Sequence, residues 1–445
     1  MVGLILSRSC LFGILSFFIV VVCVFSSVEL VIMRFLSTTL LVLCCVVATV
    51  PRFVAADPSV GNFLRGDIYG NNSLQSGFSS DCGVYGPGFS FSPGLNSCLK
   101  SEGYLRYQPT LSIGGMEHFI RLNLAGKSRS YTEHGILHGY GAFNLDMTFD
   151  AERSSNKGYV HKWVMIPYIE QAYMHLAGFT LGRAKTPWHF LSGDILYFKY
   201  GRENCDSYVD LVSYTHGFGN GVTAAVSIEN PSALSYDSER YYNKVRRFPD
   251  LAGNIRVSQG WGSSQVMIAL RDGYGKPSSR GGERTDHNSL GWAVGFGTEF
   301  SRKEHGSLGF RVAYGAGALK RVSTFFPSSR VSDFTHSGLK NKAVALHVAG
   351  KQLITDKLSL ALSASYARYF KAQTSDTSTD TSTNDKYLSQ KGVGIALHCE
   401  PVPTFSVSMG AEYMLLRDDL RDEANGMSRS RSSSIVMGIR LTHSW

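Results

Sequence analysis

The chain ends with Ser434-Ile-Val-Met-Gly-Ile-Arg-Leu-Thr-His-Ser-Trp445, and this stretch decides the fold. Every second residue from Trp445 back to Ile435 is apolar except His443, and the residues between them are small or polar except Val436. A period of two is that of a β-strand, because successive side chains point to opposite faces. In a soluble sheet the apolar face covers a core, whereas in a transmembrane barrel it faces lipid and the polar face lines a lumen.

The same alternation recurs in about sixteen segments, as an outer-membrane barrel requires. The cleanest is 136–149, where Leu137, Phe143 and Leu145 oppose His138 and Asn144. The other predicted strands are 103–107, 119–125, 168–177, 179–185, 206–216, 221–229, 251–259, 263–271, 290–300, 307–317, 343–353, 358–369, 388–399, 404–415 and the strand that ends at Trp445.

The connections between these segments alternate between long and short after the first hairpin. Long outer loops and short periplasmic turns are typical of transmembrane barrels, and an even strand count places both termini on the periplasmic side. The sequence therefore predicts an all-β fold, an antiparallel transmembrane β-barrel of about sixteen strands. The predicted outer loops are 150–167, 186–205, 230–250, 272–289, 318–342, 370–387 and 416–433.

Composition agrees with a barrel that has a wet interior. The apolar content of 43% is too low for a bundle of membrane helices. The formal net charge is +9, but the basic residues are spread over many predicted strands and loops instead of clustering with aromatic residues. We therefore expect no nucleic-acid partner.

The N-terminal region reads as a targeting segment. From Met33 a basic Arg34 precedes an apolar run and the small-residue site Val54-Ala-Ala56, so residues 33–56 are predicted to be a signal peptide and Asp57 the mature start. Residues 1–32 hold a second apolar run, which is either a membrane helix or, as we favour, an extension from a start codon assigned too early. Residues 57–98 are predicted as a periplasmic leader and 99–445 as the barrel.

Export implies an oxidising compartment, in which disulfides persist. Cys82 and Cys98 bracket a short loop rich in Gly and Pro, and are the best disulfide candidates among the cysteines of the predicted mature chain. The alternative is that both are unpaired thiols.

No catalytic or metal-binding pattern stands out. His134 and His138 are four residues apart, which on a strand is roughly 13 Å and too far for one ion. The acidic run 376–385 lacks the turn glycine and the closing glutamate of a hand-type calcium loop. We expect no enzyme activity, no metal and no cofactor.

The candidate functional residues are charges predicted to face the lumen. By the alternation of side chains, Arg106 and Arg121 face the lumen on the first two predicted strands. Three acids lie in or beside the predicted third outer loop: Asp194, Glu203 and Asp206. An acidic loop folded opposite a basic wall would create a transverse field across a narrow constriction. The alternative is that these charges only keep the lumen hydrated. Other predicted lumen-facing charges are Arg256, Arg311 and Arg440.

The stretch Cys82–Tyr107 resembles the opening of the alphaproteobacterial outer-membrane porins. In that family two cysteines flank a Tyr-Gly-x-Gly-Phe…Pro-Gly loop, and a Gly-Tyr-x-Arg-Tyr first strand follows. Weaker similarity continues through nearly all of the chain to Trp445. The matching positions are Tyr85, Gly86, Gly88, Phe89, Pro93, Gly94, Gly103, Tyr104, Arg106 and Tyr107.

The resemblance implies a sixteen-stranded homotrimeric barrel, an inward-folded third loop and passive diffusion of small hydrophilic solutes. It also implies contact with outer-membrane lipid and lipopolysaccharide, and insertion by the barrel-assembly machinery. Two residues depart from the family pattern: Glu102 stands where the family usually has Gly, and Trp445, the expected assembly signal, replaces the usual terminal Phe.

The sequence thus predicts an outer-membrane porin with weak ion selectivity. Two alternatives remain: an outer-membrane barrel enzyme, either a protease or a phospholipase, and a surface-exposed adhesion or interaction protein anchored by a barrel. Hydrolysis assays separate the first from a porin, and conductance measurements separate the second.

Overall fold

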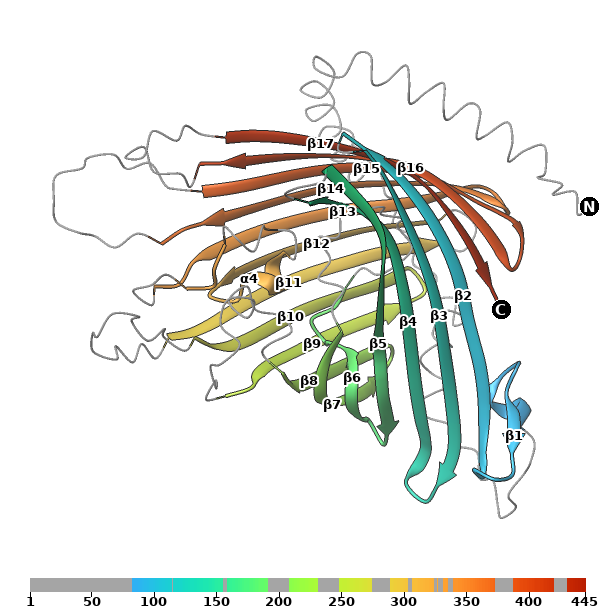
Figure 1. Cartoon of the computed structure of the whole chain (residues 1–445). Helices are drawn as coiled ribbons and strands as arrows, with labels where there is room; N and C mark the ends of the chain where they lie inside the picture. Colours follow the sequence, from blue (N-terminus) through green and yellow to red (C-terminus); the bar gives the residue numbers. More distant parts are fainter. Residues whose placement is uncertain are drawn as a thin grey trace, which may run out of the picture.

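A closed antiparallel barrel forms the body of the protein (Figure 1). The computed structural model describes residues 82–445 except 114, 155–157, 191–207, 231–247, 274–288, 303–305, 324–325, 327–330, 335–338, 373–386 and 420–429. Within these residues, each strand from β2 to β17 pairs with the next, and β17 returns to β2. The predicted fold class is confirmed.

The strands correspond one to one with those predicted. Their bounds are β2 Ser97–Ser112, β3 Gly115–Thr132, β4 Gly135–Ser154, β5 Gly158–Leu176, β6 Phe179–Lys185, β7 Tyr208–Gly219, β8 Val222–Glu229, β9 Asp250–Gln259, β10 Gly262–Gly273, β11 Ser289–Arg302, β12 Gly306–Ala316, β13 Lys342–Thr355, β14 Leu358–Phe370, β15 Tyr387–Val402, β16 Phe405–Asp418 and β17 Ser430–Ser444.

The prediction of a long outer loop at 150–167 was wrong. Strands β4 and β5 continue their ladder through this segment, with Asp150 opposite Lys162 and Ser154 opposite Gly158. Apolar alternation is required only where a strand crosses lipid, but backbone pairing can continue beyond the bilayer. The sequence pattern therefore stopped before the strands did.

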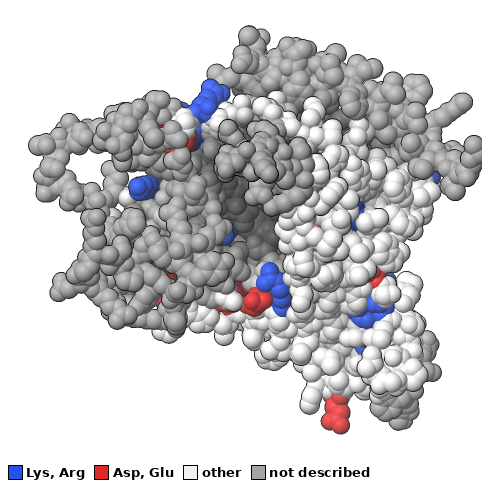
Figure 2. All heavy atoms as spheres, viewed as in Figure 1, with Lys and Arg blue, Asp and Glu red and all other residues white. Residues whose placement is uncertain are grey.

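The outward face of the barrel is apolar and exposed. On β10, Val266 and Ile268 are 58% and 53% exposed, whereas the alternating residues Met267 and Ala269 are 1% and 2% exposed. Figure 2 shows that few of the described side chains on this side of the molecule are charged. An exposed apolar surface repeated on neighbouring strands is what contact with lipid requires.

Short turns join the strands at the end of the barrel where the chain terminates. Examples are 133–134 between β3 and β4, 177–178 between β5 and β6, and 356–357 between β13 and β14. The longer connections lie at the opposite end, as expected for the outer side of a barrel. Among the described residues, no helix has the length and apolarity needed to span a membrane.

Strand β2 extends past the end of β17, and a short strand covers the edge that this leaves. Trp445 makes backbone hydrogen bonds to Gly103, and beyond that point β1 (Ser90–Ser92) pairs with β2. An unpaired strand edge is a site of unwanted pairing, so this cover closes the edge.

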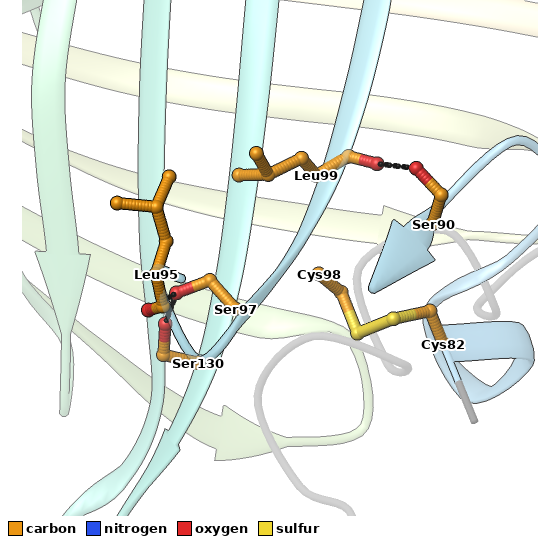
Figure 3. The surroundings of a disulfide bond; sticks show 7 residues. All are labelled: Cys82, Ser90, Leu95, Ser97, Cys98, Leu99 and Ser130. Atoms are coloured by element: carbon orange, nitrogen blue, oxygen red, sulfur yellow. Dashed lines mark hydrogen bonds between the residues drawn. A yellow bond between two sulfur atoms is a disulfide. The ribbon is translucent and has the colours of Figure 1, made fainter. Parts of the chain in front are cut away.

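A disulfide fixes this cover in place. Cys82, in the short helix η1 (Cys82–Tyr85), is bonded to Cys98 on β2, which confirms the predicted pair (Figure 3). In the same view Ser90 Oγ donates a hydrogen bond to the Leu99 carbonyl oxygen. The predicted signal peptide, the extension before it and most of the predicted leader lie outside the described residues.

Candidate functional site: the barrel lumen

The connection after β6 comprises residues 186–207 and is here called L3, and its first five residues turn into the barrel. Its described part, Thr186–Phe190, packs on the inner wall, and Trp188 and Phe190 are almost completely buried. A Cβ at Gly297 of β11 would overlap the Phe190 ring, so the absence of a side chain there lets L3 approach the wall. The third loop is thus inward-folded where it is described, as the resemblance implied.

Polar groups on the wall hold L3 at this position. Asn254 of β9 donates its side-chain N–H to the Pro187 carbonyl oxygen at 2.6 Å. Gln265 of β10 donates to the Pro187 and His189 carbonyl oxygens at 3.0 and 3.1 Å. These bonds satisfy backbone carbonyls that a buried loop would otherwise leave unpaired.

A second connection also enters the lumen. Residues 317–341, here called L6, contain the one-turn helix α4 (Leu319–Val322), and Trp188 Nε1 donates to the Arg321 carbonyl oxygen at 2.6 Å. We predicted 318–342 only as an outer loop. Apolar residues in that segment were the available signal, since Leu319, Val322, Phe326 and Val331 all join the buried cluster inside the barrel.

Buried ion pairs join L3 and L6 to the wall. Arg321 of α4 donates to Glu229 of β8 at 2.5 Å and to Thr186 of L3 at 3.1 Å. Arg271 of β10 pairs with Asp250 of β9 at 2.6 Å and with Asp333 of L6 at 2.9 Å. Removing one partner of a buried pair leaves an uncompensated charge and costs about 3–5 kcal/mol. None of these five ionic residues was predicted as functional.

Two of the predicted lumen-facing arginines belong to this filled half of the lumen. Arg311 points inward but is buried, and its Nη2 donates to the Arg321 carbonyl oxygen at 2.9 Å. Arg256 lies 5.6 Å from the centre of the Phe190 ring and donates to Ser263 at 3.0 Å. Both contact the inward loops rather than an open passage.

The opposite wall, formed by β2–β5 with β17, is polar. Arg106, Arg121 and Asp146 are cross-strand neighbours on β2, β3 and β4, and Arg121 binds Asp146 through two hydrogen bonds of 2.7 and 2.8 Å. Asp146 was absent from the predicted site. Strand alternation in the sequence indicates that Asp146 faces the lumen, but its position opposite Arg121 depends on the strand register.

The adjoining row of this wall carries neutral polar groups. Asn123 donates to Asn144 at 2.6 Å, and Asn144 donates to the Tyr168 hydroxyl at 3.0 Å. Arg440 of β17, also predicted to face the lumen, donates to Gln108 at 2.7 Å. Such groups can exchange hydrogen bonds with water or with a hydrophilic solute.

The remaining predicted residues fall in different places. The three acids Asp194, Glu203 and Asp206 lie outside the described residues. Glu102 pairs with Lys127 at 2.7 Å, so the residue that departs from the family pattern has a partner across the strand pair. Trp445 packs its ring against Gly103, where a Cβ would be too close to the ring.

Among the described residues, no three His, Cys, Asp or Glu side chains are grouped so that they could hold a metal ion. On one side of the lumen, the described residues of L3 and L6 pack on the wall with their buried ion pairs, and the other side has a polar wall.

Comparisons with known proteins agree with this architecture. Residues 80–438 match a family model described as "Porin subfamily". The porin Omp2b of Brucella abortus is 26% identical over an alignment of 208 residues, and the match covers 42% of this chain and 55% of that protein. Omp2b of Brucella suis gives the same values. The chain thus spans about half the length of the curated relatives it matches.

A solved structure with a similar fold is the outer membrane channel DcaP of Acinetobacter baumannii. The TM-score is 0.56 at 16% sequence identity, and the alignment covers 80% of this chain and 99% of DcaP. At that identity the likeness supports the fold alone.

Proposed function

We propose, because this chain belongs to the porin subfamily, that it forms a water-filled channel for passive diffusion of small hydrophilic solutes and ions. The protein is a multi-pass barrel of the bacterial outer membrane. The observation that carries the proposal is the polar inner wall of β2–β4, where Arg106, Arg121 and Asn123 face the lumen while the loops L3 and L6 fill the other side. A wall of hydrogen-bonding groups beside packed loops suits a narrow, hydrated passage.

We place the constriction between the described part of L3 and the row Arg106, Arg121 and Asp146. This row holds two arginines and one aspartate, so its formal charge is positive. We assign the opposing negative charge to Asp194, Glu203 and Asp206 of L3. The opposite signs of the two sets partly cancel, which supports weak ion selectivity.

Single-channel recording in a planar bilayer tests the proposal. A porin gives stepwise, ohmic conductance in proportion to salt concentration. Purified protein that inserts but does not conduct would be a barrel anchor of an adhesion protein. Protein that does not conduct but hydrolyses peptides or phospholipids in detergent would be an enzyme, which we do not expect.

We further propose that the functional form is a homotrimer, inserted by the barrel-assembly machinery that recognises the C-terminal strand ending at Trp445. The exposed apolar band of the barrel offers surface both for lipid and for a neighbouring protomer. Cross-linking of membranes before detergent extraction should yield a trimer, and a monomer band alone would contradict this assembly.

A further inference from the structure

Two histidines on neighbouring strands meet on the inner wall, near the end of the barrel where short turns join the strands. His138, near the start of β4, is directly opposite His175, near the end of β5. The spacing of His134 and His138 along one strand excluded a shared ion, but strand pairing brings His138 to a different histidine. His138 and His175 are here called the histidine pair.

The alternation of side chains places the histidine pair inside the barrel. On β4, Asn144 has the same alternation as His138 and is 0% exposed, whereas Phe143 is 38% exposed on the outer face. On β5, Met174 precedes His175 and is 53% exposed on the outer face. Because successive side chains of a strand point to opposite faces, both histidines face the lumen.

The two rings are close enough to bind one ion between them. Their centres are 5.7 Å apart and their planes meet at 78°. Two imidazoles that bind one tetrahedral ion through nitrogen, at about 2.0–2.1 Å each, have ring centres roughly 5 Å apart. Small rotations about the side-chain bonds close this difference, so the strands themselves need not move.

A hydroxyl group on the next strand orients one of the rings. His175 Nδ1 and Thr180 Oγ1 of β6 are 2.9 Å apart. When Nδ1 donates its proton to this hydroxyl, Nε2 carries the lone pair that binds an ion, and histidines that bind metals usually have such a partner. His138 is 8% exposed, and among the described residues none makes a hydrogen bond to its ring. The histidine pair therefore offers two imidazole ligands.

The surroundings of the histidine pair select the kind of ion. Imidazole nitrogen suits Cu²⁺, Zn²⁺ and Ni²⁺, whereas Ca²⁺ and Mg²⁺ need oxygen ligands. The residues that flank the pair in the same cross-strand row are Arg129 and Thr180, and neither is a carboxylate. The guanidinium carbon of Arg129 lies 6.0 Å from the centre of the Phe89 ring. Its positive charge disfavours a cation that is held by charge alone.

We infer that the histidine pair binds a divalent transition-metal ion, Cu²⁺ more tightly than Zn²⁺, inside the lumen near its periplasmic end. The order of affinity is that of nitrogen ligands in general. Two protein ligands leave the remaining coordination positions to water or to a ligand carried by a solute. The site would give the barrel a binding function besides the diffusion of hydrophilic solutes, because it retains one class of ion.

Titration of the metal-free, untagged protein with Cu²⁺ in detergent tests this site. Electron paramagnetic resonance reports the binding, and its nitrogen hyperfine splitting reports how many imidazoles are bound. The test variants are His138→Gln and His175→Gln. The control is His134→Gln, because His134 is exposed in the turn before β4. Heat-modifiable electrophoretic mobility verifies that each variant is folded, and Zn²⁺ and Mg²⁺ serve as competing ions.

We expect wild type to bind one Cu²⁺ through two nitrogens, and each test variant to bind it more than about tenfold more weakly. Loss of a ligand should cost more than loss of the group that orients it, which typically costs about tenfold or more. Thr180→Val should therefore weaken binding about tenfold while the spectrum keeps two nitrogens. The control should bind as wild type does, Zn²⁺ in excess should displace Cu²⁺, and Mg²⁺ should not.

Wild-type affinity in either test variant overturns the site. An equal loss of affinity in His134→Gln overturns the pairing of His138 with His175, and displacement of Cu²⁺ by Mg²⁺ overturns the class of ion. Binding in detergent does not require conduction, so failure of this site leaves the proposed channel unaffected.

Discussion

At the scale of single residues, the pairing of Arg121 with Asp146 changes what each arginine of the polar wall contributes. Arg106 and Arg121 both face the lumen and are directly opposite each other on β2 and β3, so the sequence alone gives no reason to distinguish their roles. In the structure Arg121 is neutralised by a bidentate partner at 2.7 Å. Replacing Arg121 therefore removes a positive charge and also leaves the Asp146 carboxylate without this partner.

We predict that Arg106→Ala with Arg121→Ala moves the pore toward cations. Two unit charges about 8 Å apart in water interact by roughly 0.5 kcal/mol, which corresponds to about a twofold change in permeability ratio per charge removed. The reversal potential across a salt gradient measures the change.

Asp146→Asn changes the charge of the row in the opposite direction, because it removes the carboxylate that neutralises Arg121. We expect it to shift the ion selectivity of the pore toward anions. If the reversal potential is unchanged in both variants, the row does not line the constriction, although the barrel itself would stand.

At the scale of elements, the position of L3 depends on a glycine of the facing strand. The Phe190 ring occupies the place that a side chain at Gly297 would fill. Strand β11 could accept a larger residue there only if L3 moved toward the polar wall.

Gly297→Val should therefore lower single-channel conductance, and the overpacking should cost about 1–3 kcal/mol of stability. Gly126→Val is the control, because nothing lies within 4 Å of a Cβ built at Gly126. Single-channel recordings compare the conductance of the two variants with that of wild type. Wild-type conductance in Gly297→Val would mean that L3 does not narrow the passage.

The disulfide that joins η1 to β2 beside β1 should also have a measurable effect. Cys82→Ser with Cys98→Ser releases a cross-link that spans 16 residues of sequence. The expected loss is about 3 kcal/mol by loop entropy. Urea unfolding of the refolded barrel measures it, and protease should cut between Cys82 and Cys98 faster in the variant. Unchanged stability together with unchanged cleavage would show that β1 covers the strand edge without the cross-link.

At the scale of the whole molecule, charge near the passage matters more than the total. The formal net charge of +9 alone suggests an anion pore. Charges in outer loops are screened over about 8 Å at physiological salt, whereas charges at a constriction act on every ion that passes. The buried pairs of Arg271 and Arg321 contribute little to selectivity, because their partners neutralise them.

The extent of the mature molecule is a further prediction at this scale. We expect the outer-membrane protein to start at Asp57, because the small residues of Val54-Ala-Ala56 suit signal-peptide cleavage. N-terminal sequencing of outer-membrane material checks this. A start at Met1, or anywhere before Met33, would contradict both the cleavage site and the assignment of residues 1–32.

The features that could be predicted from the sequence are those that follow from local alternation. A period of two residues, repeated between short turns, specified the strands, their lipid-facing sides and the closed barrel. The spacing of Cys82 and Cys98 around one short loop specified their bond. These features depend on residues that are near one another in the chain.

The arrangement of the lumen could not be predicted from the sequence. Strand alternation predicts that Arg121, Arg311 and Arg440 face the lumen. It does not predict that Arg121 binds Asp146, or that Arg311 is buried against the inward loops. Loops carry no periodicity, and the contact of Trp188 with Arg321 joins residues 133 positions apart. Such contacts depend on the register and curvature of the whole closed sheet, because only closure brings distant strands and loops into the same enclosed space.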